Sequence, residues 1–236
     1  MLGSRFLRLP VAIVVAAMFA GDLAGVRDGR SQEPARPQEA PQQKEITDWR
    51  EWTSDDCLQV LRSSPWAQTV AGEWSGNDDM QVYAPRTVQF RSALPIRQAL
   101  ARRMLLANHY DQLDAAGRAI LDRQVEENLQ QDFRDTIVIR ISGGTGQGPT
   151  AVLQTPDGKR YISQRTVIVQ SYPNPIEFEV IFGRLKADGT PRLPPEGEIR
   201  IFFGWMNPKA KSPTMRVTGG VTFDLSRMMY RGKFEY

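Results

Sequence analysis

The feature that most constrains the fold is a series of short strand-like segments in the second half of the chain, separated by turn residues. In several of these segments an apolar residue recurs at every second position, as in Ile176, Phe178, Val180 and Phe182. This spacing places one face of each strand in the core. No helix long enough for a crossover separates consecutive segments, so we expect antiparallel pairing. The expected strands cover residues 136–141, 151–155, 160–170, 176–182, 198–203, 215–218 and 221–225.

Two segments between the strands carry strong turn signals. Residues 156–159 read Pro-Asp-Gly-Lys and residues 187–190 read Ala-Asp-Gly-Thr. Together with the antiparallel strands, they predict an α+β fold built on an antiparallel β-sandwich or a strongly curved sheet. The folded part, 47–236, is long enough for one domain with a substantial core.

The first half of this domain predicts helices. Thr53 or Ser54 can cap a short N-terminal helix, which ends before Pro65. A strand over 80–91 follows, with its Pro85 typical of an edge or a bend.

Two longer helices come next, and they form the largest helical element of the prediction. Pro95 suits the first turn of one helix, and Asp114 opens a second. These helices form a hairpin inserted after the first strand, most simply as a cap over a sheet.

The first 46 residues read as an export signal and a disordered linker. Arg5 and Arg8 precede an apolar run of ten residues, 11–20, which suits a signal peptide; a spanning helix needs roughly 20 predominantly apolar residues. Cleavage after Ala20 and cleavage after Ser31 both remain open. Residues 31–44 are rich in Pro, Gln and Glu, so we expect residues 21–46 to be a disordered linker that acts as a spacer. The protein is therefore expected to be exported, either periplasmic or secreted, with no membrane span in the mature chain.

Charge and rare residues limit the chemistry. The net charge is +3 and becomes +1 when residues 1–20, with Arg5 and Arg8, are removed, so nucleic acid is not an expected partner. Cys57 is the only cysteine and His109 the only histidine, which excludes an internal disulfide and metal sites with two imidazoles. We expect no metal or cofactor, a buried Cys57, and a His109 that is a polar residue at a helix end.

Catalytic signatures are weak throughout. The glycine-rich run 142–148 is followed by Pro149 and a strand instead of a helix, which argues against a phosphate-binding loop. No Gly-x-Ser-x-Gly elbow is present. Glu177 and Glu179 are expected on the solvated face of a strand, although a dispersed acid/base pair remains possible. The chain is therefore interpreted as a binding module that is not evidently catalytic, and an extracytoplasmic hydrolase is the alternative.

Four of the five tryptophans lie close together in sequence, at Trp49, Trp52, Trp66 and Trp74. They could form a carbohydrate-binding platform, but packing into the core is the simpler interpretation.

Counting strand reversals predicts a binding surface. The loops at 143–148, 172–175 and 205–208 should emerge at one end of the sheet, with the two Asp-Gly turns at the other. The first end would gather aromatic, amide and cationic side chains, the usual materials of a site for a protein or saccharide ligand. The candidates are Tyr172, Asn174, Trp205, Asn207 and Lys209. The alternative is that these loops only terminate strands and that Trp205 tucks under the sandwich.

Two short motifs carry a family resemblance. Residues 52–58 read Trp-Thr-Ser-Asp-Asp-Cys-Leu, and residues 61–67 read Leu-Arg-Ser-Ser-Pro-Trp-Ala. The helix entry at 91–100 matches in the same way. The chain resembles a group of uncharacterised exported bacterial proteins that share this opening. The resemblance implies export and a bacterial envelope setting, and it implies no activity or site residue.

Overall fold

The computed structural model describes residues 48–70, 86–144, 150–170, 176–206 and 215–236. These residues belong to one compact unit, Glu45–Tyr236, while a second unit, Met1–Lys44, lies outside the described residues. The expected signal peptide and the expected linker therefore remain predictions.

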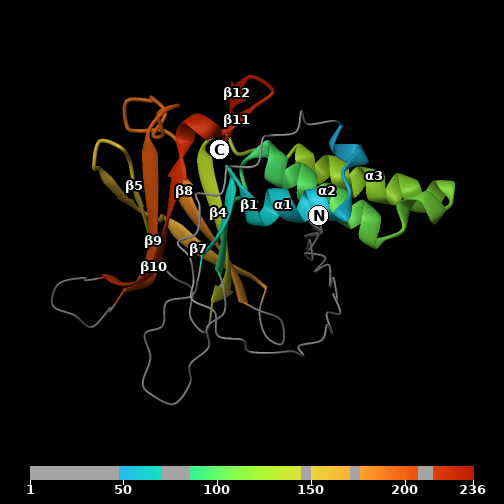
Figure 1. Ribbon diagram of the computed structural model, residues 1–236, viewed down its shortest axis with the longest axis horizontal. Helices are drawn as coiled ribbons and strands as arrows, with labels where there is room; N and C mark the ends of the chain where they lie inside the picture. Colours follow the sequence, from blue (N-terminus) through green and yellow to red (C-terminus); the bar gives the residue numbers. More distant parts are fainter. Residues whose placement is uncertain (1–47, 71–85, 145–149, 171–175, 207–214) are drawn as a thin grey trace, which may run out of the picture. The chain divides into compact units, whose positions relative to one another are not determined.

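Two antiparallel sheets form the body of the unit (Figure 1). Sheet A has the strand order β1-β2-β3-β4-β8-β7, and sheet B has the order β10-β9-β5-β6. The strands of sheet A are β1 (Ser63–Ser64), β2 (Ala67–Val70), β3 (Arg86–Phe90), β4 (Thr136–Gly144), β7 (Arg165–Gln170) and β8 (Ile176–Gly183). Those of sheet B are β5 (Thr150–Gln154), β6 (Arg160–Ile162), β9 (Glu198–Met206) and β10 (Met215–Asp224). The predicted α+β class and antiparallel pairing are confirmed.

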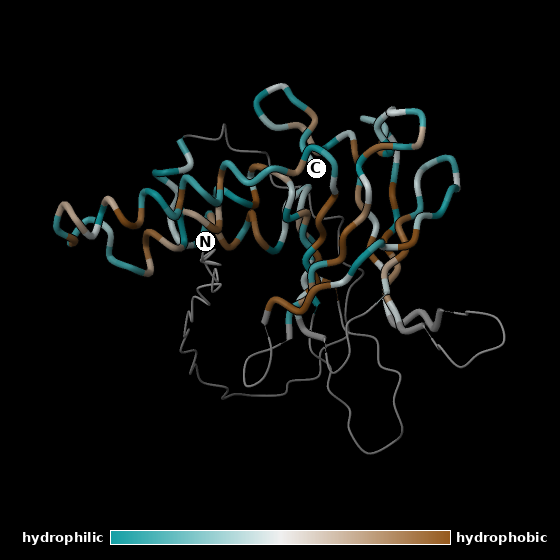
Figure 2. Tube along the Cα trace, turned by 180° about the vertical axis from the view of Figure 1, so that it is seen from behind, coloured by the Kyte–Doolittle hydropathy of each residue, from teal (hydrophilic) through white to brown (hydrophobic). Residues whose placement is uncertain are grey.

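The two sheets share one hydrophobic core, as in a sandwich. Phe90 of sheet A and Phe223 of sheet B meet edge to face with ring centroids 5.0 Å apart. Alternate residues of β4, β8 and β9 are buried on the facing sides. Figure 2 shows the same pattern as hydrophobic residues along the middle of the strands and hydrophilic residues at the turns.

The segment 160–170, expected as a single strand, is divided between the sheets. Ser163 N donates to Ala151 O of sheet B at 2.8 Å, and the next residue, Gln164, donates through its N to Ile181 O of sheet A at 2.8 Å. The chain therefore changes sheets between these two residues. The prediction of one strand was wrong because periodicity does not show which partner each half finds.

β10 is one strand where two were expected. Its pairing with β9 continues across Gly219 and Gly220, with a bulge between Val217 and Gly219. A Cβ at Gly219 would lie 2.5 Å from Cε2 of Phe203 on β9, so glycine at this position allows β10 to pack closely against its neighbour.

The helical part contains α1 (Ser54–Arg62), α2 (Leu94–Ala107) and α3 (Ala115–Leu129), with short 3-10 turns η1 (Trp49–Glu51) and η2 (Tyr110–Gln112). Thr53 caps α1 in a capping box with Asp56, and Asp114 caps α3. The hairpin of α2 and α3 extends sideways from the sheets instead of covering a sheet face (Figures 1 and 2). Only Leu121 and Val125 of α3 are buried, which leaves the helix too little apolar surface to cover a sheet.

The hairpin also follows a β-hairpin that the sequence did not indicate. β1 and β2 precede β3, so the helical insertion comes after the third strand and not the first. The chain ends with η3 (Leu225–Arg227) and the small hairpin of β11 (Met229–Tyr230) and β12 (Lys233–Phe234).

Candidate functional site

The strand ends that border the predicted binding loops meet at one end of each sheet. In sheet A, Gly144 at the end of β4 pairs with Ile176 at the start of β8, and β7 ends beside them. In sheet B, Thr150 at the start of β5 pairs with Gly204 of β9, and Met206 at the end of β9 pairs with the first residue of β10. We call this end of the two sheets the loop end; it points downward in Figure 1.

The two Asp-Gly turns lie at the opposite ends of their sheets. The first follows Gln154, which pairs with Arg160 and Arg200. The second follows β8, whose last residue, Gly183, pairs with Thr136 at the start of β4. The described strands thus run in the alternating directions on which the loop-end prediction depends.

The predicted site residues themselves are mostly outside the described part of the chain. Tyr172, Asn174, Asn207 and Lys209 lie outside the described residues. The backbone of Trp205 belongs to β9, where it pairs with Arg216 one residue before the strand ends, but its side chain is not described. The composition of the loop-end site remains a prediction.

The described tryptophans form part of the core and not a carbohydrate platform. Trp49, Trp52 and Trp66 are buried, and Trp66 Nε1 donates to Glu235 O at 2.8 Å. The ring of Trp66 meets the ring of Tyr230 edge to face at 6.1 Å. The fourth member of the predicted group, at position 74, lies outside the described residues.

The single cysteine and the single histidine occupy structural positions, as expected. Cys57 is fully buried on α1, and burial raises the pKa of its thiol to about 11. His109 is exposed just after α2, in the left-handed region with φ 49°, and its N donates to Leu106 O at 3.1 Å.

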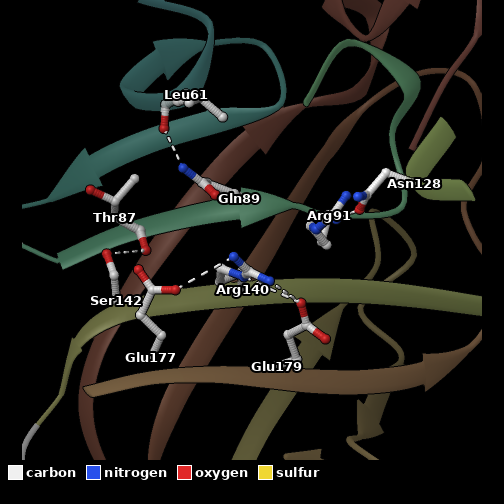
Figure 3. Close-up of polar contacts among 9 residues, drawn as sticks. All are labelled: Leu61, Thr87, Gln89, Arg91, Asn128, Arg140, Ser142, Glu177 and Glu179. Carbon is white, nitrogen blue, oxygen red and sulfur yellow. Dashed lines mark hydrogen bonds and ion pairs between the residues drawn. The ribbon is translucent and has the colours of Figure 1, made fainter. Parts of the chain in front are cut away.

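A charged cluster occupies the outer face of sheet A, the face that points away from sheet B (Figure 3). Arg140 of β4 lies between two carboxylates of β8. Its Nη2 is 2.6 Å from Oε1 of Glu179, and its Nη1 is 3.5 Å from Oε2 of Glu177. Glu177 and Glu179 alternate with buried residues on β8, and the three charged side chains are 21 to 27% exposed, so this strand face is only partly solvated. Because Arg140 engages both carboxylates, they do not form a free acid and base.

Arg91 continues this polar row at the end of β3. It is 8% exposed, and its Nη2 donates to Oδ1 of Asn128 on α3 at 3.1 Å (Figure 3). Its Nε and Nη1 are buried without a hydrogen-bond partner. The pKa of Arg91 is lowered to about 10, mainly by burial and also by Arg140 and Arg97, whereas Glu179 raises it.

A shallow depression of about 460 Å³ begins one residue further along the chain, at Ser92. Arg97 of α2 lines it, donates through Nη1 to Leu129 O, and stacks over the ring of Phe133 with 5.3 Å from its guanidinium carbon to the ring centroid. The Nε of Arg97 is buried without a partner, like the two nitrogens of Arg91. The lining residues are Ser92, Arg97, Leu129, Gln130, Gln131, Asp132, Phe133, Arg134, Arg184 and Glu235. We call this region, with Arg91 beside it, the arginine end.

Sequence reasoning missed the arginine end. One signal was present: Arg140 lies at the centre of a β-branched run between Ile139 and Ile141, a position where a charged residue needs a partner. The alternating glutamates of the 176–182 segment could have supplied it. No sequence signal brings α3 or the C-terminus to this place.

Comparison with known proteins adds no function. No protein-family model matches the chain, and the comparison with curated proteins finds no match either. Within the described ranges, no helix is both long and apolar enough to cross a membrane. Within the same ranges, no group of three or more His, Cys, Asp or Glu side chains is placed to hold a metal ion.

Proposed function

We propose that the chain is an exported binding module that recognises a protein or saccharide ligand at the loop end. The observation that carries the proposal is the register of the strands. The pairs Gly144 with Ile176 and Thr150 with Gly204 bring the borders of the predicted loops to one end of each sheet. Loops held by rigid strands are the usual place for recognition residues.

The proposed contacts come from aromatic faces, amide groups and a cation. Tyr172 and Trp205 supply the aromatic faces, Asn174 and Asn207 supply amide donors and acceptors, and Lys209 supplies the positive charge. Aromatic residues in such a surface contribute most of the binding free energy.

The proposal places the protein outside the cytoplasm, in line with the signal-like segment 1–20. Cell fractionation combined with N-terminal sequencing tests this part. A mature N-terminus beyond residue 20 in the extracytoplasmic fraction supports it, and an intact Met1 in the cytoplasmic fraction contradicts it.

The binding surface is tested with an array of defined saccharides and a matched pair of variants. Any saccharide that binds the wild type is titrated against Trp205→Ala and against Lys186→Ala, a control at the opposite turn. Trp205→Ala should weaken binding by about 1 to 3 kcal/mol with little change in the unfolding midpoint. If it instead lowers the free energy of unfolding by about 3 to 5 kcal/mol, Trp205 is a core residue and the proposal loses its central contact.

A further inference from the structure

Two arginines carry all the buried side-chain nitrogens without partners in the described part of the chain. These are Nε and Nη1 of Arg91 and Nε of Arg97. Neither arginine forms an ion pair with a described carboxylate, and only longer-range attraction acts on them, from Glu179 on Arg91 and from Glu235 on Arg97. A buried charge without a counter-charge or full hydrogen bonding is strongly unfavourable, and such groups in native proteins call for a specific explanation.

The neighbouring arginines are satisfied within the protein. Arg140 is held by two glutamates. Arg134 pairs with Asp132 at 2.6 Å. Arg184 donates to Tyr236 O and stacks over the tyrosine ring at 4.1 Å. Among these arginines, nitrogens without a hydrogen-bond partner are therefore confined to Arg91 and Arg97, and Arg97 lies close enough to lower the pKa of Arg91.

Arg97 and Arg91 differ in their place at the depression, because Arg91 is not one of its lining residues. Arg97 lines it directly. Arg91 is held by its hydrogen bond to Asn128. Ser92, which follows Arg91, and Leu129, which follows Asn128, both line the depression. The depression is open to solvent and lies beyond the ends of β4 and β8 that pair through Thr136 and Gly183, opposite the loop end. A ligand in this place would therefore not use the loop-end contacts.

We propose that the depression is a binding site for one compact oxyanion group, a carboxylate or a phosphate, with Arg97 as its donor and the buried charge of Arg91, next to the lining residue Ser92, as an added attraction. An oxyanion supplies both requirements that the protein leaves open. Its negative charge offsets the two buried cations, and its oxygens accept hydrogen bonds from guanidinium nitrogens, the strongest class of such bonds in proteins. Ser92 and the glutamines at 130 and 131 add polar groups around the same opening. This site is separate from the proposed loop-end function and does not depend on it.

The test is thermal unfolding of the full chain with inorganic phosphate or acetate, each compared with chloride at equal ionic strength. An oxyanion at ten times its dissociation constant should raise the unfolding midpoint by about 3 to 6 °C. A shift with phosphate alone assigns a phosphate ligand, and a shift with acetate assigns a carboxylate ligand. Because phosphate also stabilises proteins non-specifically, the decisive quantity is the difference between wild type and variants.

Arg97→Gln should lose the anion-specific shift, and Arg91→Met, which removes a nearby buried charge, should reduce it. Arg123→Gln, which removes the same charge from the exposed face of α3, should retain it. If Arg97→Gln or Arg91→Met fails to fold, Arg97→Lys is measured instead. The lysine keeps the positive charge but lacks the guanidinium Nε, so this variant should retain less than half of the shift. The proposal is overturned if neither anion shifts the wild type beyond chloride, or if Arg97→Gln responds like Arg123→Gln. Trp205→Ala should keep the full shift, which separates this site from the loop end.

Discussion

The two ends of sheet A are built in different ways. The loop end consists of strands of one sheet that stop together, and its geometry follows from the ladder pairs Gly144 with Ile176 and Gln170 with Glu177. The arginine end is assembled from segments far apart in the chain. Arg97 on α2 reaches Leu129 at the end of α3, and Arg184 after β8 reaches Tyr236 at the C-terminus. One end depends on strand direction, and the other depends on where helices and the chain terminus pack.

The two ends should also differ in how well they tolerate substitution. Loops beyond strand ends can change without disturbing the ladders that carry them. At the arginine end the polar groups are themselves structural, since the guanidinium groups bond to main-chain oxygens of α3 and of the C-terminus. A substitution at the loop end should therefore affect binding alone, whereas one at the arginine end should affect both stability and binding.

Trp66→Ala should have the largest effect of the variants that test this contrast. Trp66 is 2% exposed, and it anchors the C-terminal segment through Glu235 O and Tyr230. Its loss should lower the free energy of unfolding by about 3 to 5 kcal/mol, measured by urea denaturation. Because Glu235 lines the depression, the anion response should weaken as well.

Trp66→Phe is the matched control for this variant. It keeps an aromatic ring and removes the indole hydrogen bond, so it should cost only about 1 to 2 kcal/mol. If Trp205→Ala proved as destabilising as Trp66→Ala, the two ends would not differ in the way described.

The sequence was sufficient to predict the strands that form the loop end, but not the contacts that form the arginine end. Period-two alternation in 176–182 and 199–203, together with the Asp-Gly turns, was sufficient to predict antiparallel strands and their directions. Helix starts at Thr53 and Asp114 were predictable because capping chemistry is local.

The missed features all depend on tertiary partners. The change of sheet at Ser163 is determined by which carbonyl each amide finds, and the course of β10 through Gly219 is determined by a ring on the neighbouring strand. The arginine end was missed for the same reason: Arg91 and Asn128 are 37 residues apart, with a helical hairpin between them. Local propensity contains no information on such contacts.

Gly219→Ala tests how far the loop end tolerates change inside the strands that support it. The added Cβ would lie 2.5 Å from Cε2 of Phe203, a buried ring that has no room to move. We expect a loss of about 2 to 3 kcal/mol from overpacking. Gly189→Ala at the opposite turn is the control, since its φ of 79° adds strain but nothing lies within 4 Å, and it should cost about 1 kcal/mol. Equal costs would show that β9 and β10 adapt more readily than their packing indicates.

Arg140→Gln tests the link between the polar face of sheet A and the arginine end. The variant leaves Glu177 and Glu179 half-buried without their cation, which should cost about 1 to 2 kcal/mol in urea denaturation. Arg165→Gln on exposed β7 is the control and should be nearly neutral. Glu179, once released, should turn its charge toward Arg91 and compete with an added oxyanion, so the anion response should fall. An unchanged response would show that the cluster and the depression act independently.

Asp132→Asn should have the smallest effect on stability and still alter binding. Asp132 and Arg134 form an exposed pair at the rim of the depression, and bonds from Arg134 lower the pKa of the carboxyl to about 2. The carboxylate is therefore charged throughout the range from neutral pH to pH 4, and any stability that the pair adds is lost only as the pH falls from about 4 through about 2.

The Asp132→Asn variant frees Arg134 and removes a negative charge from the opening of the depression. Oxyanion binding at pH 7 should become tighter by about twofold to threefold at low salt, and the gain should vanish in about 0.5 M salt because exposed charges are screened. Weaker oxyanion binding in Asp132→Asn would contradict an opening that selects for negative charge.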